Sequence, residues 1–329
     1  MGGPAESKDN TALAVRRANL PALRPSIGLA LGGGGARGLA HILMLEVFDE
    51  LGLKPTIIAG TSIGALFGAA YASGLAAKDI RTLTEKALSS RFDLARLLLS
   101  ARAEPILRLL HILPIRHALL SPEAVLKTVL PKGMPSDFSQ LPIPLRVLAT
   151  DFYAQEQLVI ERGPLLSAVA ASIALPAIFS PVVREGHVLM DGGLVNPLPF
   201  DILRGEADLI VAVDVSGAST GPGRHPTPSA FDAVVSSSQI LQRTIVREKL
   251  KAQQPDIYID VEVDEYSVLD FHRFEKILSA SIPAQDKLRR QLRRVLSSQP
   301  AETLPLATPT GTPARKIRVR PRTADKESP

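Results

Sequence analysis

The sequence predicts an α/β fold in which helices cover the faces of a mainly parallel sheet. A strand-length apolar run at 26–31 leads through a glycine-rich turn into a helical pattern, and a second strand, turn and helix follow at 56–72. Two such units in succession require parallel strands with helices packed on them. Strand-length apolar runs return after residue 143. With 329 residues, 45% of them hydrophobic, the chain can bury a sizeable core.

The first unit runs from strand 26–31 through a run of glycines into a helix over 39–51 that Gly52 ends. The pattern Gly33-x-Gly35-x-x-Gly38 has the form of a dinucleotide fingerprint, but the next strand, 56–59, carries no acid to hold a ribose. A P-loop would need a lysine followed by serine or threonine after the last glycine, and two apolar residues stand there. The other functional interpretation is an oxyanion hole, because glycine amides can converge on one oxygen. The structural alternative is a loop that needs positive φ.

The second unit contains the motif Gly60-Thr61-Ser62-Ile63-Gly64 between the strand 56–59 and a helix of small residues over 65–72. A strand that turns sharply into a helix at G-x-S-x-G has the form of a nucleophile elbow, which exposes the serine hydroxyl at the end of the strand. The amides of the turn also lie at a helix N-terminus, where negative charge is favoured. An ordinary strand–turn–helix is the alternative, since the pentapeptide alone is a weak signal.

Residues 75–144 are expected to be largely helical. A helical period covers 78–90, and Ser121-Pro122-Glu123 opens another helix with a cap and a first-turn proline. The leucine-rich runs 94–99 and 106–113 would form a cap over an acyl-binding site, a membrane-contacting surface or a helical subdomain that buries its own leucines.

After residue 143 the α/β pattern resumes. Asp191-Gly192-Gly193 follows a hairpin over 182–190 that turns at Glu185-Gly186, so an acid stands at a strand end where two glycines permit close approach of another loop. A competing acid, Asp214, ends a later strand, 209–213. The remaining expected elements are strands 145–150, 157–160 and 256–259 and helices 165–175, 231–252 and 271–298.

Both ends of the chain differ in composition from the body. Residues 26–298 carry 28 basic and 28 acidic residues, so the net charge of +5 lies in the ends, which argues against a nucleic-acid-binding body. Residues 1–25 show no signal peptide and are expected to be a flexible lead, and the protein is expected in the cytoplasm. The tail 299–329 is expected to be disordered, with contact to an anionic membrane and a solvated tail as equal alternatives.

Two uncharged windows, 55–77 and 163–183, have the length of membrane spans. Glycines or prolines interrupt each of them, so buried strand and helix units are the expected interpretation. The chain has no cysteine, which excludes disulfides and thiolate metal sites.

A nucleophilic serine needs a base, for which histidine held by an acid is the usual choice. No histidine of this chain has a neighbourhood that demands a catalytic role, although His272 after Asp270 matches the chain order of the α/β hydrolases. The histidines are His41, His111, His117, His187, His225 and His272.

The glycine loop 33–38, the elbow at Ser62 and Asp191-Gly192-Gly193, in this order, resemble the patatin-like phospholipases, in particular their bacterial members. The segment 171–181 is also similar to the one that precedes the acid in that family, and the resemblance covers roughly 26–199. Gly32 departs from the plant members, which have an acid there that is not part of the chemistry. The resemblance implies a three-layer α/β domain over 26–298, with 75–144 as a helical insert or cap.

The resemblance also implies a serine–aspartate dyad without histidine. Ser62 would be the nucleophile and Asp191 its proton acceptor, with the amides of Gly33, Gly34 and Gly35 as oxyanion hole. Arg37 would anchor the glycine loop or meet a lipid phosphate. The other motif positions expected to bind substrate or shape the site are Gly38, Gly60, Gly64, Gly192 and Gly193.

The implied activity is serine esterase hydrolysis of phospholipid, lysophospholipid or other fatty-acyl esters, that is, lipid degradation without metal or organic cofactor. The alternative is a non-catalytic regulatory protein of the same fold that binds a lipid or a protein through 94–120. A nucleotide-binding enzyme is the third hypothesis.

Overall fold

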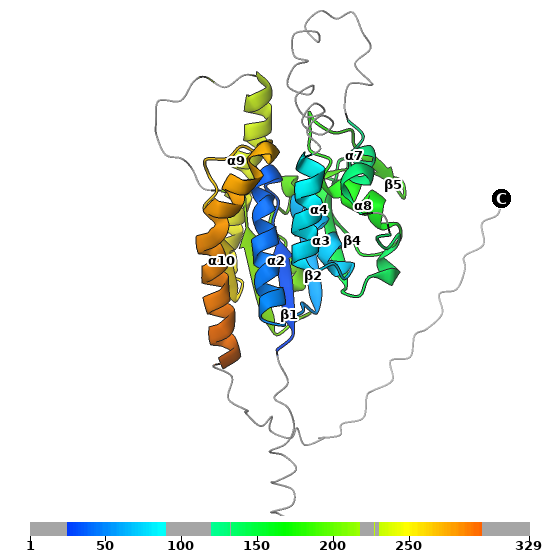
Figure 1. The fold of residues 1–329 in the computed structure, drawn as a ribbon. Helices are drawn as coiled ribbons and strands as arrows, with labels where there is room; N and C mark the ends of the chain where they lie inside the picture. The colour runs from blue at the N-terminus through cyan, green and yellow to red at the C-terminus, as the bar shows by residue number, and fades with distance from the viewer. Residues whose placement is uncertain (1–24, 90–119, 132, 218–226, 228–229, 298–329) are drawn as a thin grey trace, which may run out of the picture.

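A computed structural model describes residues 25–89, 120–131, 133–217, 227 and 230–297 (Figure 1). The leucine-rich runs 94–99 and 106–113 and the tail 299–329 lie outside these residues, as does nearly all of the lead 1–25.

The described strands form one mixed sheet with the order β5-β6-β3-β2-β1-β7-β8, and β4 pairs with β3. Its parallel part consists of β1 (Ile27–Leu31), β2 (Ile57–Thr61), β3 (Leu145–Asp151), β7 (Leu209–Asp214) and β8 (Ile257–Asp260). Antiparallel pairs are added by β4 (Glu156–Ile160), β5 (Val182–Arg184) and β6 (His187–Asp191). The predicted α/β class with a mainly parallel sheet is therefore confirmed.

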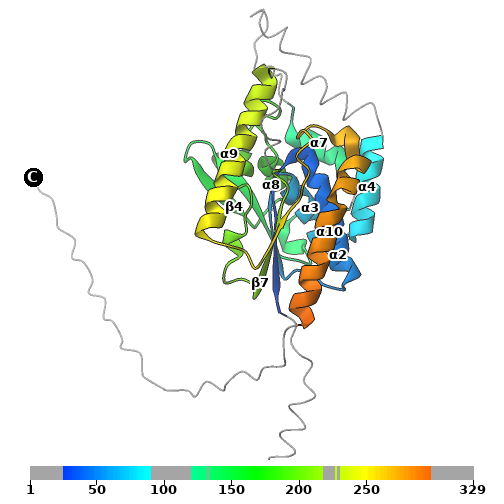
Figure 2. The same cartoon turned by 90° about the vertical axis from the view of Figure 1, so that its left-hand side faces the viewer.

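Helices cover both faces of the sheet, so the domain has three layers (Figure 2). One face packs on α2 (His41–Glu50), α3 (Ile63–Ala72), α4 (Ala77–Ser89), α8 (Leu165–Ser172) and α10 (Phe274–Ser297). The other face packs on α9 (Ala230–Ala252) and on the segment around η5 (Asp201–Leu203). Short elements connect these layers: α7 (Pro122–Val129), η1 (Gly35–Ala40), η3 (Phe138–Gln140), η4 (Gly192–Leu194) and η6 (Phe271–Arg273).

Strand β1 is apolar throughout because it lies in the centre of the sheet, with a core on each face. Leu29 and Leu31 belong to the larger core beneath α2 and α3, and Ala30 between them points to the smaller core beneath α9. Alternate side chains leave a strand on opposite faces, and here both faces are buried, so the run is apolar throughout.

Two predicted helices differ at their ends. The helix expected over 165–175 ends at Ser172, because the residue before Pro176 is disfavoured in the helical conformation and the chain must leave the helix before it. The helix expected over 271–298 begins with the 3₁₀ turn η6. The uncharged window 55–77 contains β2 and α3, and among the described residues no helix has the length and apolarity to cross a membrane.

Candidate active site

Ser62 stands where β2 turns into α3, with φ 54° and ψ −122°. A positive φ is costly for a residue with a side chain and marks a sharp turn held by its surroundings. The flanking glycines are sterically required: a Cβ on Gly64 would lie 2.2 Å from the Leu31 carbonyl oxygen, and one on Gly60 would lie 2.6 Å from the Ala65 Cα. The turn therefore has the geometry of a nucleophile elbow.

The sheet register brings the end of β6 to this elbow. Thr61, the last residue of β2, is paired with Leu148 on β3, and Asp191, the last residue of β6, is paired with Ala149, the next residue of β3. Strand β4 occupies the other side of β3, so β2 and β6 approach each other end to end along the same side. The Ser62 hydroxyl donates a hydrogen bond to Asp191 Oδ2 over 2.6 Å.

Asp191 is held in place from several sides. Its side chain also accepts a hydrogen bond from the Gly193 amide, 2.7 Å from Oδ1, and its carbonyl accepts one from the Thr150 hydroxyl over 2.8 Å. A Cβ on Gly192 would lie 2.2 Å from the Leu148 carbonyl oxygen. A Cβ on Gly193 would lie 2.8 Å from the side-chain amide of Gln242 on α9. Gly192 is thus sterically required beside the carboxylate, whereas at Gly193 the Gln242 side chain would have to shift to make room for a Cβ.

The Asp191 carboxylate is almost completely buried, with 2% of the residue exposed. Burial disfavours the charged form and raises its pKa to about 6, although the hydrogen bonds from Ser62 and Gly193 favour the charged form. A base with a pKa near neutrality accepts a proton readily and can return it in a later step.

Ser172 fixes the backbone of the elbow and was not singled out by the sequence reasoning. Its hydroxyl donates to the Leu148 carbonyl over 2.6 Å and accepts from the Ser62 amide over 2.9 Å. A serine at a helix end carries no local signal of this contact, which depends on how α8 packs on β3. The Ser62 amide is consequently occupied.

The glycine loop approaches Ser62, but its amides are not equivalent. A Cβ on Gly33 would lie 3.4 Å from the Ser62 Cβ, yet the Gly33 amide already donates to the Pro197 carbonyl over 2.9 Å. The amides of Gly34 and Gly35 have no hydrogen-bond acceptor in the part of the chain that the structure describes. Gly35 has φ +58° and lines the cavity beside Ser62. The Gly33 amide is thus engaged within the fold, so of the three expected oxyanion-hole amides only those of Gly34 and Gly35 have no acceptor among the described residues.

Arg37 is buried behind the glycine loop. Its guanidinium donates to the carbonyls of Tyr266 and Ser216, over 2.7 and 2.5 Å, and to Gln239 Oε1 over 3.0 Å. Burial and the neighbouring Arg243 lower its pKa to about 10, which leaves it charged at neutral pH. These contacts fit the expected role of loop anchor.

Gly38 has a steric role. A Cβ at this position would lie 2.2 Å from the Ile63 Cγ2, so the glycine lets η1 pack directly on the start of α3. Among the described residues Gly38 does not line the cavity beside Ser62.

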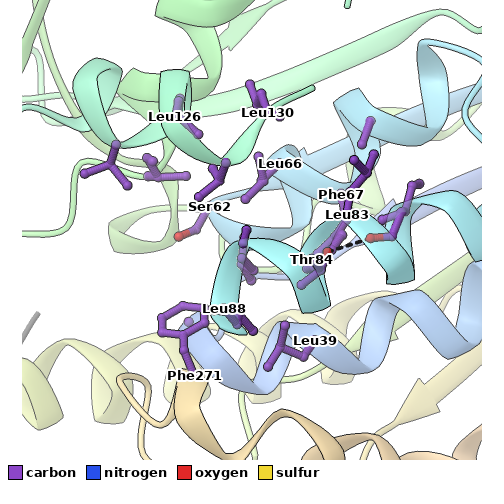
Figure 3. A pocket seen from close by; sticks show the side chains of 18 of the residues that line it. Leu39, Ser62, Leu66, Phe67, Leu83, Thr84, Leu88, Leu126, Leu130 and Phe271 are labelled. Carbon is purple, nitrogen blue, oxygen red and sulfur yellow. Dashed lines mark hydrogen bonds between the residues drawn. The ribbon is translucent and has the colours of Figure 1, made fainter. Parts of the chain in front are cut away.

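An apolar cavity of about 170 Å³ opens beside Ser62 (Figure 3). Its walls come mainly from α3, α4 and α7, so the described helices of the region 75–144 line the site. Ser62 and Thr84 supply the only hydroxyl groups among the described lining residues, and the Thr84 hydroxyl bonds back to the Ile80 carbonyl over 2.7 Å. The labelled apolar side chains around Ser62 in Figure 3 are Leu39, Leu66, Phe67, Leu83, Leu88, Leu126, Leu130 and Phe271.

The described histidines have other contacts. Buried His41 donates from Nε2 to the Gly32 carbonyl over 2.9 Å, and desolvation lowers its pKa to about 4. His187 is paired with Asp151 at 2.5 Å, and His272 is exposed in η6. His111, His117 and His225 lie outside the described residues.

The competing acid Asp214 accepts hydrogen bonds from the Tyr258 hydroxyl and the Ser216 amide, and it does not contact Ser62. Within the described ranges, no group of three or more histidine and carboxylate side chains is placed to hold a metal ion.

Comparison with known proteins identifies the family. A model described as patatin-like phospholipase matches residues 29–204. The chain belongs to the patatin-like phospholipase family. A protein of Mycobacterium tuberculosis named as an uncharacterised NTE family protein is 38% identical over 206 residues, which are 62% of this chain and 53% of that protein. This patatin-like chain thus spans about half the length of its mycobacterial relatives.

The match to animal proteins covers a smaller share of their length than the match to the mycobacterial proteins does. The neuropathy target esterase sws of Drosophila melanogaster is 30% identical over 281 residues, covering 77% of this chain and 19% of that protein. Among solved structures, human GIVD cytosolic phospholipase A2 superposes with a TM-score of 0.42 at 14% identity, covering 88% of this chain and 62% of that chain. VipD from Legionella pneumophila superposes with a TM-score of 0.40 at 15% identity, covering 81% and 67%. Similarity at the level of these two structures assigns neither the site nor the substrate.

Proposed function

We propose that this patatin-like protein is a serine lipid acyl hydrolase that cleaves carboxylic esters of fatty acids, with phospholipids or lysophospholipids as substrates. The observation that carries the proposal is the 2.6 Å hydrogen bond from the Ser62 hydroxyl to the buried Asp191 carboxylate, at the edge of an apolar cavity. Membership of the family supports the same class of reaction.

In the first half-reaction, the Ser62 oxygen attacks the ester carbonyl carbon while Asp191 takes the hydroxyl proton. The carbonyl oxygen becomes an oxyanion, for which the unoccupied amides of Gly34 and Gly35 are the proposed donors. When the tetrahedral intermediate collapses, Asp191 returns the proton to the departing alcohol oxygen. The acyl group is then bonded to Ser62.

In the second half-reaction, Asp191 takes a proton from a water molecule, whose oxygen attacks the acyl carbon. Collapse of this second intermediate breaks the bond to Ser62, which recovers its proton from Asp191 and releases the carboxylic acid. One carboxylate serves as base and acid in turn, so the described histidines have no step to perform.

The cavity supplies the proposed binding site for the acyl chain. Its lining is apolar except for Ser62 and Thr84, so a hydrocarbon chain would lose its contact with water without leaving polar groups unsatisfied. A polar headgroup has no partner among these lining residues and would remain outside the cavity.

The decisive measurement is hydrolysis of a chromogenic acyl ester and of phospholipid vesicles by the wild type, Ser62→Ala and Asp191→Asn. We expect product only from the wild type, and equal turnover by all three proteins would refute the assignment. A serine-directed fluorophosphonate distinguishes a hydrolase from a non-catalytic lipid-binding protein of the same fold. The hydrolase is labelled covalently at Ser62, whereas a folded sample that is not labelled would support the binding protein.

A further inference from the structure

The segment 196–198, which follows the dyad aspartate by a few residues, connects several parts of the site through its carbonyl groups. The Asn196 carbonyl accepts a hydrogen bond from the Thr61 hydroxyl over 2.8 Å, and Thr61 directly precedes Ser62. The Pro197 carbonyl accepts from the Gly33 amide over 2.9 Å, and Gly33 directly precedes Gly34. One short segment therefore holds both the strand that carries the serine and the loop that carries the free amides.

Lys249, from α9 on the opposite face of the sheet, fixes this segment. Its ammonium donates to Asn196 Oδ1 over 2.6 Å and to the Leu198 carbonyl over 2.9 Å, and it forms an ion pair with Asp201. An ammonium has three N–H donors, and here each has an acceptor. The Lys249 side chain is 16% exposed, so water competes little for these bonds.

Asn196 is in turn held on all its polar groups. Its amide group donates to Gln157 Oε1 over 2.8 Å and to Asp201 Oδ1 over 3.1 Å, and its backbone amide donates to the Gly192 carbonyl over 2.9 Å. Asn196 is 3% exposed, so loss of the ammonium would leave a buried Oδ1 without its donor. The segment would have to shift to recover a partner.

We infer that Lys249 is a positioning residue for the reaction: through the segment 196–198 it sets the placement of the glycine loop relative to Ser62. The inference rests on the proposed function, and Lys249 acts without touching the substrate. Its effect on rate follows from geometry, since a misplacement of about 1 Å in the reacting groups can cost about 10²-fold. Of the glycine loop, Gly35 lines the cavity, whereas Asn196, Pro197 and Lys249 do not, so substrate binding should change less than the rate.

The test compares Lys249→Met with Lys251→Met. Lys251 lies two residues further along the same helix and is exposed, with Glu248 as its partner at 2.9 Å, so the control removes the same charge without touching the site. For Lys249→Met we expect kcat for a soluble acyl ester to fall by about 10- to 100-fold while KM changes less than about threefold. Lys251→Met should match the wild type. Lys249→Arg keeps the charge but not three converging donors, so it should recover only part of the rate.

Thr61→Val provides a second approach to the same segment, and it remains available if Lys249→Met does not fold. It removes only the hydroxyl that donates to the Asn196 carbonyl, and we expect kcat to fall with KM retained. Because both side chains act through segment 196–198, the double variant should lose less than the product of the two single losses. Full independence of the two losses would contradict the inference.

Hydrogen exchange gives a readout that does not need activity. The Gly33 amide bonds to the Pro197 carbonyl, so Lys249→Met should exchange faster than Lys251→Met in peptides that cover 32–38. Unchanged exchange there would overturn the positioning role, whatever happens to kcat, and so would a loss confined to KM. If Ser62→Ala were as active as the wild type, the proposed function would be refuted. Hydrogen exchange at the Gly33 amide would then be the measurement that tests whether Lys249 positions the glycine loop.

Discussion

Apolar packing forms one side of Ser62, and a hydrogen-bond network forms the other. On the cavity side, α3, α4 and α7 present apolar side chains such as Leu66, Leu126 and Leu130, and Ser62 and Thr84 are the described lining residues whose side chains form hydrogen bonds. On the polar side, the network of Asp191, Asn196, Lys249 and their partners has hydrogen bonds on almost every polar atom.

This difference indicates how each side should respond to change. Apolar contacts have no preferred direction and depend on area, so a wall of leucines can accept chains of several lengths. Hydrogen bonds depend on distance and angle, so the polar side fixes one arrangement of the reacting groups. Substitutions on the polar side should therefore change kcat, and substitutions on the cavity side should change KM and chain-length preference.

The largest effect is expected at the dyad. Asp191→Asn removes the proton acceptor but keeps the shape of the side chain, and we expect kcat to fall by at least about 10⁴-fold in this variant and in Ser62→Ala. Ester hydrolysis with purified variants measures this, and a cooperative thermal transition in each variant serves as the folding control. A loss of less than tenfold in Asp191→Asn would place the base elsewhere.

The pH profile tests the same carboxylate without a substitution. Because burial raises the Asp191 pKa to about 6, the base is charged above this pH and protonated below it. We expect kcat/KM to be flat above pH 7 and to fall about tenfold per pH unit below 6. His187 is paired with Asp151 and His272 is exposed in η6, so His187→Gln and His272→Gln should retain this acid limb. Its disappearance in either variant would assign the limb to that histidine.

The stability of the fold should record the burial of Asp191. An acid whose folded-state pKa lies above its unfolded value gives full stability below the unfolded value, and this contribution is lost as the pH rises through the folded value. The rise of the Asp191 pKa from 3.8 to about 6 on folding therefore costs about 3 kcal/mol of unfolding free energy between pH 4 and 7. Asp191→Asn lacks this penalty, so its unfolding free energy from urea titration should exceed that of the wild type at pH 8 by more than at pH 4. An equal difference at both pH values would contradict the raised pKa.

The cavity side should show a smaller effect on a different parameter. Leu130→Ala enlarges the cavity beside Ser62 and should shift the preferred acyl chain among p-nitrophenyl esters toward longer chains. The kcat on the preferred ester should stay within about threefold of the wild-type value. Leu241→Ala is the matched control, because Leu241 is 60% exposed on α9. A large fall in kcat with no change in chain-length preference would show that the cavity side also controls the rate and would contradict the separation of roles between the two sides.

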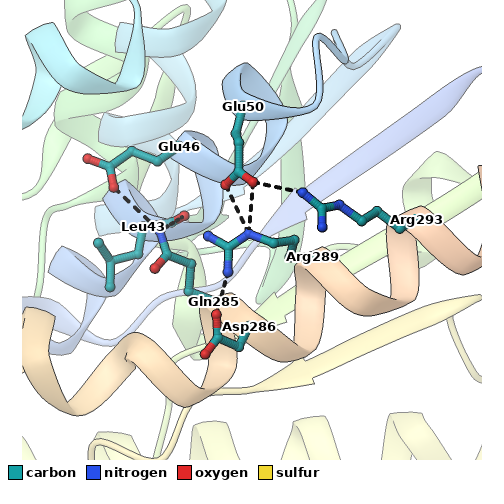
Figure 4. A network of polar contacts seen from close by, with 7 residues as sticks. All are labelled: Leu43, Glu46, Glu50, Gln285, Asp286, Arg289 and Arg293. Carbon is teal, nitrogen blue, oxygen red and sulfur yellow. Dashed lines mark hydrogen bonds and ion pairs between the residues drawn. The ribbon is translucent and has the colours of Figure 1, made fainter.

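The smallest effect is expected at the contact between α2 and α10, away from both sides of Ser62 (Figure 4). The Arg289 Nε lies 2.9 Å from Glu50 Oε2, and Arg293 Nη2 lies 3.1 Å from Glu50 Oε1. These groups are partly exposed, so Arg289→Met should lower the unfolding free energy by only about 0.5–1 kcal/mol and leave kcat unchanged. Urea titration measures the first quantity, and a change in kcat beyond twofold would show that α10 affects the site.

Much of the site could be predicted from local sequence. Ser62 and its flanking glycines form a recognisable turn, and Asp191-Gly192-Gly193 lies at a strand end as expected. Ser172 and Lys249 could not be found in this way, because a serine at a helix end and a lysine in a long helix are ordinary by composition. The hydrogen bond from the Gly33 amide to the Pro197 carbonyl could not be predicted either, since the two residues are distant in the chain.

Which segments become strands, turns and helices follows largely from the sequence, because apolar periodicity and glycine positions act over a few neighbouring residues. The end-to-end meeting of β2 and β6 along β3, which brings the Ser62 hydroxyl within 2.6 Å of Asp191 Oδ2, is a property of the folded sheet that no local pattern predicts. Strand order and register arise from packing between segments far apart in the chain. The same packing decides that the Gly33 amide bonds to Pro197 while those of Gly34 and Gly35 have no acceptor among the described residues.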